Sequence, residues 1–219
     1  MKTMRYDAVI FDMDGTLLDT LIDLKNAVNH VLEQFGYPTR STAEIRRFLG
    51  GGARNLIVRA MPEGSTEEKI DEVLDVYRVY YAEHANDLTA PYPGIVDMLE
   101  TLKQQGVKLA VASNKPDEQV KSLTQEHFGR WIDHAMGDRE GMRCKPHPDM
   151  VYEILKPLGV DVSRALYVGD SEFDVQTAIN AGMDCAAVTW GFRDRDELEA
   201  AGAVCFADTA QELQKIVLG

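Results

Sequence analysis

The sequence predicts an α/β fold, in which helices cover both faces of a parallel sheet and a separate helical module interrupts the chain early. Two observations predict this fold. Short apolar runs, typical of buried strands, alternate with amphipathic helical stripes over most of the chain. The exception is the long interval between Phe11 and Val107, where helical periodicity repeats and no strand is expected. The alternation indicates crossover helices over a sheet, and the exception indicates an insertion.

The predicted strands are short runs rich in aliphatic and aromatic residues. They cover residues 6–11, 107–112, 165–168, 185–188 and 203–206, with a weaker run around residues 134–136. Apolar residues recur at helical spacing in three further stretches, at 95–102, 151–158 and 213–217. We therefore expect residues 1–19 and 90–219 to form a Rossmann-like, three-layer core with a parallel sheet.

The inserted module is predicted to span residues 20–89 and to be wholly helical. Its apolar stripes predict helices at 21–35, 45–49, 56–61 and 70–81, and Ser65 or Thr66 is the expected cap of the last one. Breakers at 36–38 and 61–64 separate the helices, and the proline-rich stretch 91–94 marks the return to the core.

The composition is that of a globular protein with an acidic surface. The chain has 219 residues, of which 45% are hydrophobic and 27% charged, and its net charge is −13 from 23 Lys and Arg against 36 Asp and Glu. Such a charge disfavours nucleic-acid and anionic-membrane partners. No apolar run approaches the ~20 residues of a membrane span, no signal-peptide pattern is seen, and the three cysteines lack metal-ligand spacing. We expect a cytoplasmic protein.

Polar residues follow three of the predicted strands at their carboxyl ends. Asp12 and Asp14 follow the first strand, Ser113 and Asn114 follow the second, and Asp170 follows the third, with Asp174 one helical turn later. In an open parallel sheet the ligand crevice lies outside these ends, so the three segments are expected to meet.

These residue types indicate a cation site and phosphoryl chemistry. Asp12, Asp14 and Asp170 would repel one another unless a cation or protons neutralise them. Oxygen ligands suit a hard ion such as Mg²⁺, which shares its shell with substrate phosphate. A carboxylate can also act as a covalent nucleophile, and Lys145 is the candidate cation to balance the transferring group.

Taken singly, each feature has an ordinary structural explanation. The Asp12–Asp14 pair can be a turn, Ser113 and Asn114 can cap a helix, Lys145 can be a surface lysine, and Asp170 can belong to a turn. The combination favours function, because all of the features fall in order at or between strand ends.

The sequence resembles the haloacid dehalogenase superfamily of phosphotransferases. Residues 12–17 (DMDGTL) match its first motif, Ser113 its second, Lys145 its third, and Gly169-Asp170 with Asp174 its fourth. The inserted module resembles the small helical cap of that superfamily. Stretches 91–94, 113–116, 145–148 and 190–193 are most similar to its phosphoglycolate phosphatase group. A dehalogenase of the superfamily would lack Asp14, which argues against carbon–halogen cleavage.

The resemblance implies a mechanism and a Mg²⁺ cofactor. Asp12 would attack phosphorus to form an aspartyl-phosphate, and Asp14 would protonate the leaving oxygen and then activate water. Asp12, the Asp14 carbonyl and Asp170 would hold Mg²⁺. The remaining roles fall to residues around them: Ser113 and the Asn114 backbone would bind phosphoryl oxygens, Lys145 would stabilise Asp12 and the transferring group, and Asp174 would orient the metal site or Lys145.

Substrate choice is expected from the inserted module. Gly52 and Arg54 follow a glycine run between two predicted helices, where the backbone can approach a ligand and Arg54 can pair with a substrate carboxylate or second phosphate. A flexible turn with a solvated arginine is the alternative. Cys144, beside Lys145, is a further candidate for a lowered thiol pKa.

These expectations amount to a Mg²⁺-dependent phosphatase that acts on a small phosphorylated metabolite, as a monomer or weak homodimer. Phosphoglycolate is the leading substrate, on resemblance alone. Pyrophosphatase, sugar-phosphate or nucleotide phosphatase and phosphomutase activities remain alternatives within the superfamily. A non-catalytic phosphate-binding protein is an alternative of a different class, which the intact set of motif residues disfavours.

Overall fold

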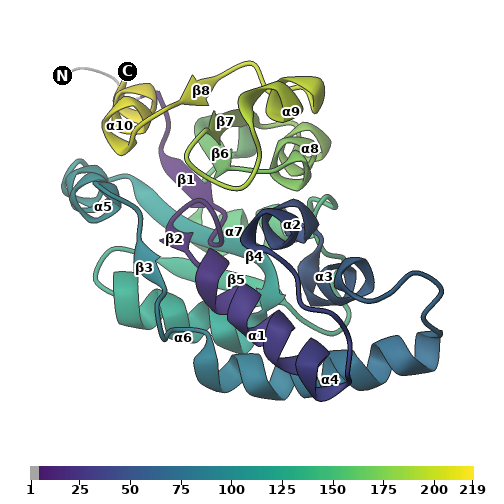
Figure 1. The fold of residues 1–219 in the computed structure, drawn as a ribbon. Coiled ribbons are helices and arrows are strands. Elements are labelled where there is room, and N and C mark those ends of the chain that lie inside the picture. Colours follow the sequence, from purple (N-terminus) through teal and green to yellow (C-terminus); the bar gives the residue numbers. More distant parts are fainter. Residues whose placement is uncertain (1–4) are drawn as a thin grey trace. The chain divides into compact units, whose positions relative to one another are not determined.

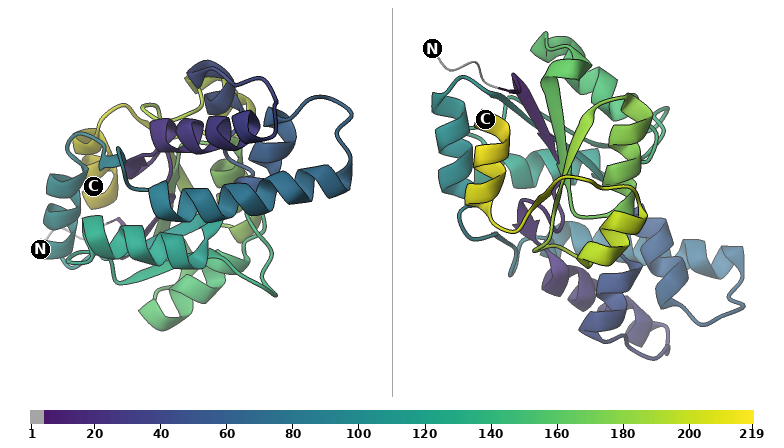
Figure 2. Two further views of the ribbon diagram at one scale, coloured as in Figure 1. Left: turned by 60° about the horizontal axis from the view of Figure 1, so that its bottom comes forward. Right: turned by 90° about the horizontal axis from the view of Figure 1, so that it is seen from above.

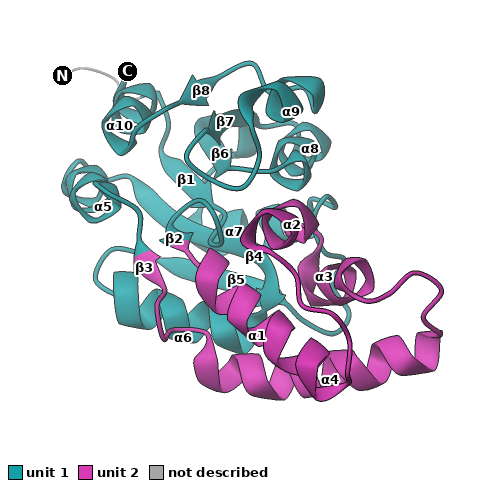
Figure 3. Cartoon of the chain, in the orientation of Figure 1, with its two compact units in different colours: residues 1–18, 91–219 teal, residues 19–90 magenta. Residues whose placement is uncertain are grey.

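The computed structural model describes residues 5–219 and divides the chain into two compact units (Figure 3). One unit comprises Met1–Leu18 and Pro91–Gly219, and the other comprises Asp19–Ala90. The chain passes between them at β2 (Leu18–Asp19) and β3 (Ala90–Pro91), which pair with each other as a two-stranded sheet. Within the described residues, no helix has the length and apolar character needed to span a membrane.

The first unit is built on a six-stranded parallel sheet (Figure 1). Its strands lie in the order β5-β4-β1-β6-β7-β8. The bounds are β1 Ala8–Phe11, β4 Lys108–Pro116, β5 His134–Asp138, β6 Ala165–Gly169, β7 Asp184–Val188 and β8 Phe206–Ala207. The four residues of β1 are fully buried between β4 and β6, as expected for a central parallel strand.

Helices cover both faces of this sheet, as the second view of Figure 2 shows. On one face, Val9 and Phe11 share a core with α5 (Ile95–Gln104), α6 (Asp117–Phe128) and α10 (Ala210–Leu218). On the other face, Ala8 and Ile10 pack with α7 (Asp149–Leu158) and α8 (Glu172–Ala181), while α9 (Arg195–Ala200) packs on α8. A 3₁₀ turn, η1 (Val162–Arg164), leads into β6. The predicted three-layer α/β fold is confirmed.

The second unit is helical. It contains α1 (Leu21–Gln34), α2 (Thr42–Phe48), α3 (Gly52–Ala60) and α4 (Glu67–His84). The apolar stripes of α1 and α4 are buried, and the hydroxyl of Thr66 accepts a hydrogen bond from the Lys69 amide at the start of α4. Buried Asp23 of α1 accepts hydrogen bonds from the amides of Leu88 and Thr89, which joins the two ends of the unit.

The structure differs from the sequence-based expectation at several strands. β2 and β3 lie in the interval where no strand was expected. β4 was expected to end at Ala112, but it continues to Pro116, because its register against β5 shifts after Ala112 and pairing resumes. The last strand was expected at 203–206 and lies at β8 instead. There the amide of Ala203 still bonds to the Leu198 carbonyl and closes α9, so the strand begins later.

Candidate active site

The site lies at the carboxyl ends of three neighbouring strands. Phe11, the last residue of β1, pairs with Val111 of β4 on one side and Val168 of β6 on the other. Asp12 follows β1 directly, and its amide donates a 2.8 Å hydrogen bond to the carbonyl of Val168. Asp170 follows β6, so the strand register alone brings these two residues to one edge of the sheet.

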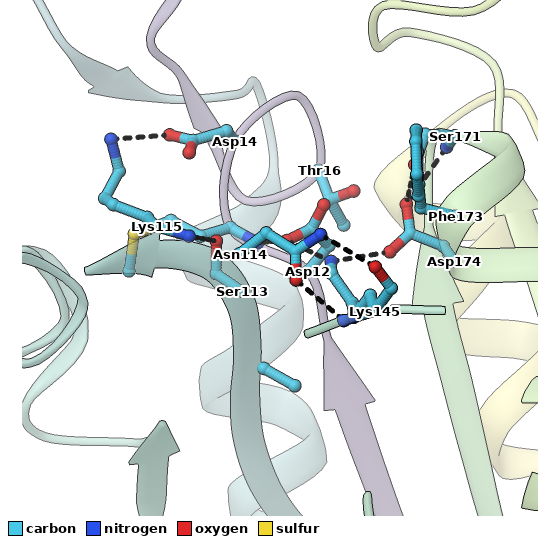
Figure 4. Close-up of polar contacts among 12 residues, drawn as sticks. Asp12, Asp14, Thr16, Ser113, Asn114, Lys115, Lys145, Ser171, Phe173 and Asp174 are labelled. Carbon is cyan, nitrogen blue, oxygen red and sulfur yellow. Dashed lines mark hydrogen bonds and ion pairs between the residues drawn. The ribbon is translucent and has the colours of Figure 1, made fainter. Parts of the chain in front are cut away.

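Lys145 lies between two carboxylates at this edge (Figure 4). Its Nζ is 2.8 Å from Oδ1 of Asp12 and 2.8 Å from Oδ1 of Asp174. The Lys145 side chain is 2% exposed and that of Asp174 is fully buried, whereas 11% of the Asp12 side chain remains exposed. Of the three groups, Asp12 is therefore the one that a substrate can reach.

Asn114 of β4 fixes the backbone of Lys145. The Asn114 side-chain oxygen accepts from the Lys145 amide at 2.8 Å, and its nitrogen donates to the Lys145 carbonyl at 3.2 Å (Figure 4). Tyr167 of β6 lies beneath, with its ring 6.0 Å from the Lys145 ammonium and its hydroxyl 3.4 Å from Asp174. These contacts hold a long, flexible side chain in one place.

Asp174 is held by the start of α8. Its Oδ2 accepts hydrogen bonds from the amide of Ser171 at 3.0 Å and from the Ser171 hydroxyl at 2.6 Å, in a capping-box arrangement. Its Oδ1 accepts from Lys145. Asp174 therefore accepts three hydrogen bonds, one of them from a cation, which fits a supporting role better than direct ligation.

Asp170 is held on both carboxylate oxygens as well. Its Oδ1 accepts from the Thr16 hydroxyl at 3.0 Å, and its Oδ2 accepts from the Phe192 amide at 2.7 Å. A Cβ atom at Gly15 or Gly191 would lie less than 3.0 Å from this carboxylate, and Gly15 has a φ of +85° that also favours glycine. The carboxylate thus fills the space between two glycines.

Burial and like charges dominate the electrostatics. Burial raises the pKa of Asp12 well above its usual range, and the Asp174 carboxylate adds to that rise against the opposing effect of Lys145. Burial, followed by Asp174, raises the pKa of Asp170 to about 7. For Lys145, burial favours the neutral amine, but Asp12 and Asp174 outweigh it and raise the pKa.

The donor set fits a divalent cation. Oxygens of Asp12, Asp170 and Asp174 lie within 4.8 Å of one another. Three carboxylates and the Lys145 ammonium sum to −3 + 1 = −2, so a divalent cation would balance the fully ionised cluster. Oxygen-only ligands are those that Mg²⁺ prefers. Asp174 accepts three hydrogen bonds, one of them from the Lys145 ammonium, whereas each oxygen of Asp170 accepts a single bond from a neutral donor. Asp12 and Asp170 are therefore the carboxylates best placed to hold the ion.

Asp14 lies outside this cluster and faces a different cation. Its Oδ1 is 3.3 Å from Nζ of Lys115, whose side chain is only 3% exposed (Figure 4). The contact is an ion pair without hydrogen-bond geometry. Asp14 Oδ1 is buried and accepts no hydrogen bond from the described residues. The two carboxylates thus contact different lysines, although only Met13 separates Asp12 from Asp14 in the sequence.

Sequence reasoning overlooked several residues of this site. Lys115 was seen only as part of a strand end, and Tyr167 only as an apolar strand residue. The amide of Phe192 and the Thr16 hydroxyl, which hold Asp170, were not assigned. The available sequence signal for Lys115 was its position two residues after Ser113 at a strand end. A backbone amide leaves no trace in a sequence.

The other predicted residues have clear positions. Ser113 is buried in β4, and its hydroxyl accepts from the Lys115 amide at 3.3 Å. Gly52 and Arg54 lie in the first turn of α3, not in a loop, and Arg54 forms ion pairs with Glu67 and Asp71 within the same unit. The assignment of Gly52 and Arg54 to substrate binding stays a prediction.

The expected lowering of the Cys144 thiol pKa is wrong. Burial and the neighbouring Asp138 raise the pKa of Cys144 to about 12, which outweighs the adjacent Lys145. At neutral pH the thiol is protonated, so it is a poor nucleophile.

Comparisons with known proteins agree with this geometry. Residues 9–188 match the haloacid dehalogenase-like hydrolase family. The chain is 38% identical to phosphoglycolate phosphatase 1 of Pseudomonas aeruginosa, over 84% of this chain and 70% of that protein. It is 36% identical to a phosphoglycolate phosphatase of Pseudomonas syringae pv. tomato, with the same coverage.

A solved structure matches nearly end to end. It is a protein of Lactobacillus delbrueckii subsp. bulgaricus, provisionally named a phosphoglycolate phosphatase, with 42% identity and a TM-score of 0.94. The match covers 98% of this chain and 99% of the other. The chain belongs to the haloacid dehalogenase-like hydrolase family, which confirms the predicted resemblance. Its relatives and its fold define it as a phosphatase, a phosphoric monoester hydrolase.

Proposed function

We propose that the protein is a Mg²⁺-dependent phosphomonoesterase that hydrolyses a small anionic metabolite through an aspartyl-phosphate on Asp12. Phosphoglycolate is the leading substrate. The observation that carries the proposal is the position of Lys145, 2.8 Å from both Asp12 and Asp174, beside Asp170 at the sheet edge. This arrangement leaves one partly exposed carboxylate, one fixed ammonium and a net charge that a divalent cation would balance.

Asp12 is the proposed nucleophile. Its carboxylate oxygen attacks phosphorus while the bond from phosphorus to the ester oxygen breaks, and the phosphoryl group is carried on Asp12. Oδ1 of Asp12 is held by the Met13 amide, at 2.7 Å, and by the Lys145 ammonium. The other carboxylate oxygen, Oδ2, is therefore the one that attacks the substrate. Fixing the nucleophile in this way lowers the entropic part of the barrier.

Asp14 is the proposed acid and base. In the first step it gives a proton to the leaving ester oxygen, which departs as an alcohol. In the second step it takes a proton from water, the water oxygen bonds to phosphorus, and the bond to Asp12 breaks to release phosphate. Lys115 keeps the Asp14 carboxylate turned away from Lys145 and Asp12, which suits a group that must meet the leaving oxygen.

The remaining residues bind and orient. Ser113 and the Asn114 backbone are proposed to donate to phosphoryl oxygens, and Asp174 to hold Lys145 in place. Asp12, the Asp14 carbonyl and Asp170 would hold Mg²⁺. When bound, the ion would offset negative charge on the phosphoryl oxygens.

Relatives named phosphoglycolate phosphatase support a two-carbon carboxylated substrate. Gly52 and Arg54 are the proposed contacts with the carboxylate, and Arg54 would then exchange its present acidic partners for the substrate. The net charge of −13 is consistent with a cytoplasmic enzyme that has no nucleic-acid or membrane partner, and we propose a monomer or weak homodimer.

Phosphate release from a panel of esters tests the proposal. The panel contains phosphoglycolate, other phosphomonoesters and pyrophosphate, each with Mg²⁺ and with EDTA, and Asp12→Asn is the inactive control. We expect Mg²⁺-dependent release that is fastest from phosphoglycolate and is lost in the variant. Release concentrated on another ester would keep the mechanism and replace the substrate. Release that persists in EDTA or in Asp12→Asn would refute the mechanism.

A further inference from the structure

Residues 190–193 follow β7 and form a segment that contacts the site without supplying a reacting group. We call it the 190–193 segment. Phe192 and Arg193 are buried, and Trp190 packs against the core beside Tyr92, with ring centroids 6.5 Å apart. Two of its residues donate hydrogen bonds to groups at the cation cluster, and a third anchors its end.

Three hydrogen bonds connect the 190–193 segment, Thr16 and Asp170. The Phe192 amide donates to Asp170 Oδ2 at 2.7 Å, and the Thr16 hydroxyl donates to Asp170 Oδ1 at 3.0 Å. The Trp190 indole N–H in turn donates to the Thr16 carbonyl at 3.0 Å. The segment therefore holds Oδ2 of Asp170 directly, through the Phe192 amide. It holds Oδ1 indirectly, because Trp190 fixes Thr16.

Sterics and charge fix the segment itself. The absence of a side chain at Gly191 lets the backbone lie against Asp170, since a Cβ there would come within 3.0 Å of the carboxylate. Arg193 forms a bidentate pair with Glu172, at 2.7 and 3.1 Å, in the first turn of α8. Such a fork restrains both partners more than a single contact does.

We propose that Trp190 is a positioning residue for the cation: through Thr16 it fixes the carboxylate orientation in which Asp170 binds a divalent ion. The inference rests on the proposed metal site and goes beyond it. Outer hydrogen-bond partners of metal ligands are typically worth 10–100-fold in metal affinity, because they reduce the number of orientations that the free ligand samples. Loss of the indole N–H should therefore weaken cation binding and leave the chemistry of the loaded site nearly unchanged.

Trp190→Phe is the test, because it removes the N–H and keeps an aromatic ring against Tyr92. Trp131→Phe is the matched control, since Trp131 is the second of the chain's two tryptophans and packs on the same core next to Arg130. The hydrogen bonds to Asp170 come instead from Thr16 and Phe192. Titration of each full-length protein with Mg²⁺ by calorimetry gives the affinity directly, independent of any substrate. Asp170→Asn identifies the heat that belongs to this site.

We expect Mg²⁺ affinity to fall about tenfold in Trp190→Phe and to stay at the wild-type value in Trp131→Phe. The Mg²⁺ concentration for half-maximal phosphatase rate should rise in parallel, while kcat at saturating Mg²⁺ changes less than about threefold. Equal affinities for Trp190→Phe and wild type would overturn the proposal, and so would equal weakening in both tryptophan variants.

A second variant keeps the test decisive if Trp190→Phe does not fold. Arg193→Gln releases the far end of the segment and should weaken Mg²⁺ binding in the same direction with Thr16 untouched. An unchanged affinity there would count against the proposal. If wild-type protein binds Mg²⁺ but releases no phosphate from any ester, the proposed function fails while the positioning role is still tested. If wild type binds no divalent cation, the positioning role is refuted.

Discussion

Lys145 is the residue on which the charge balance of the site depends. Among the described residues, Lys145 is the cation that pairs with both Asp12 and Asp174, and its side chain is almost wholly buried. Removing one partner of a buried charged group leaves the others without compensation, which is far more costly than losing a surface pair. The stability of the fold and the reactivity of Asp12 are therefore coupled through one side chain.

We predict that Lys145→Met lowers the free energy of unfolding by about 3–5 kcal/mol in EDTA, because it leaves two buried carboxylates unpaired. Lys103→Met is the control: Lys103 pairs with Asp133, and that pair is partly exposed. Its loss should cost no more than about 1 kcal/mol. Urea denaturation of both variants measures the difference. Equal costs would mean that Lys145 does not compensate the cluster.

Arg54 allows a second prediction at the scale of one residue. If its guanidinium binds the substrate carboxylate, Arg54→Ala should raise KM for phosphoglycolate about tenfold, since hydrogen bonds to charged groups are worth roughly 1.5–3 kcal/mol. Arg59→Ala on the same helix is the control, because Arg59 donates only to the backbone carbonyls of Arg47 and Phe48 in the structure. Steady-state kinetics decide, and an unchanged KM would remove Arg54 from the substrate site.

At the scale of elements, the turn after β1 carries Asp14 and lies against the carboxylate cluster. Gly15 has a left-handed backbone conformation and lies directly against Asp170. Three hydrogen bonds to the Met13 carbonyl, from the amides of Thr16, Leu17 and Leu18, close the turn. The turn therefore serves both the fold and the carboxylate cluster.

Gly15→Ala should lose Mg²⁺ binding and stability together. Alanine in a left-handed backbone conformation costs roughly 1–2 kcal/mol. Its methyl group also displaces the Asp170 carboxylate. Gly106→Ala is a matched control, because Gly106 has a φ of +86° against +85° for Gly15 and nothing lies within 4 Å of its added Cβ. Calorimetry and Tm measure both effects. Normal Mg²⁺ affinity in Gly15→Ala would show that the close contact with Asp170 is unimportant.

The elements that the sequence predicted well are those with strong local patterns. The central strand β1, the stripe of α5 and the long amphipathic helices α1 and α4 follow from apolar periodicity alone. Helix α6 was not assigned, because polar and charged residues fill most of Asp117–Phe128 and only four of its residues are buried. The extension of β4 was missed since polar residues continue the strand where it faces the site.

The strand order and the charge pairs of the site depend on tertiary structure. The strand ends predicted that Asp12 and Asp170 meet, whereas the contact of Lys145 with Asp12, and the choice of Lys145 or the metal site as the partner of Asp174, rested on the family resemblance alone. The sequence pattern also left Arg54 in a loop, whereas α3 begins at Gly52 and includes it. Contacts made by backbone groups, such as that of the Phe192 amide with Asp170, do not depend on residue type, so they could not be predicted from the sequence.

At the scale of the whole molecule, the phosphatase combines a parallel sheet with a strongly acidic chain. The net charge of −13 repels an anionic substrate at long range. A bound divalent cation, together with Lys145, would create a local site of opposite sign at the sheet edge. This contrast explains why a metal is central to the proposed mechanism, and it makes covalent capture on Asp12 the step that the whole arrangement serves.

Trapping the phosphorylated residue is the most direct test of that claim. Asp14→Asn is incubated with Mg²⁺ and p-nitrophenyl phosphate, whose leaving group departs without a proton from Asp14, and is then quenched with borohydride. A reduced derivative should accumulate at residue 12 alone, because hydrolysis of the acyl phosphate still needs Asp14 as the base. Peptide mass spectrometry locates the derivative, and Asp12→Asn should give none. A wild-type enzyme that turns over substrate while no variant is ever modified at residue 12, or a derivative at another carboxylate, would contradict nucleophilic catalysis by Asp12.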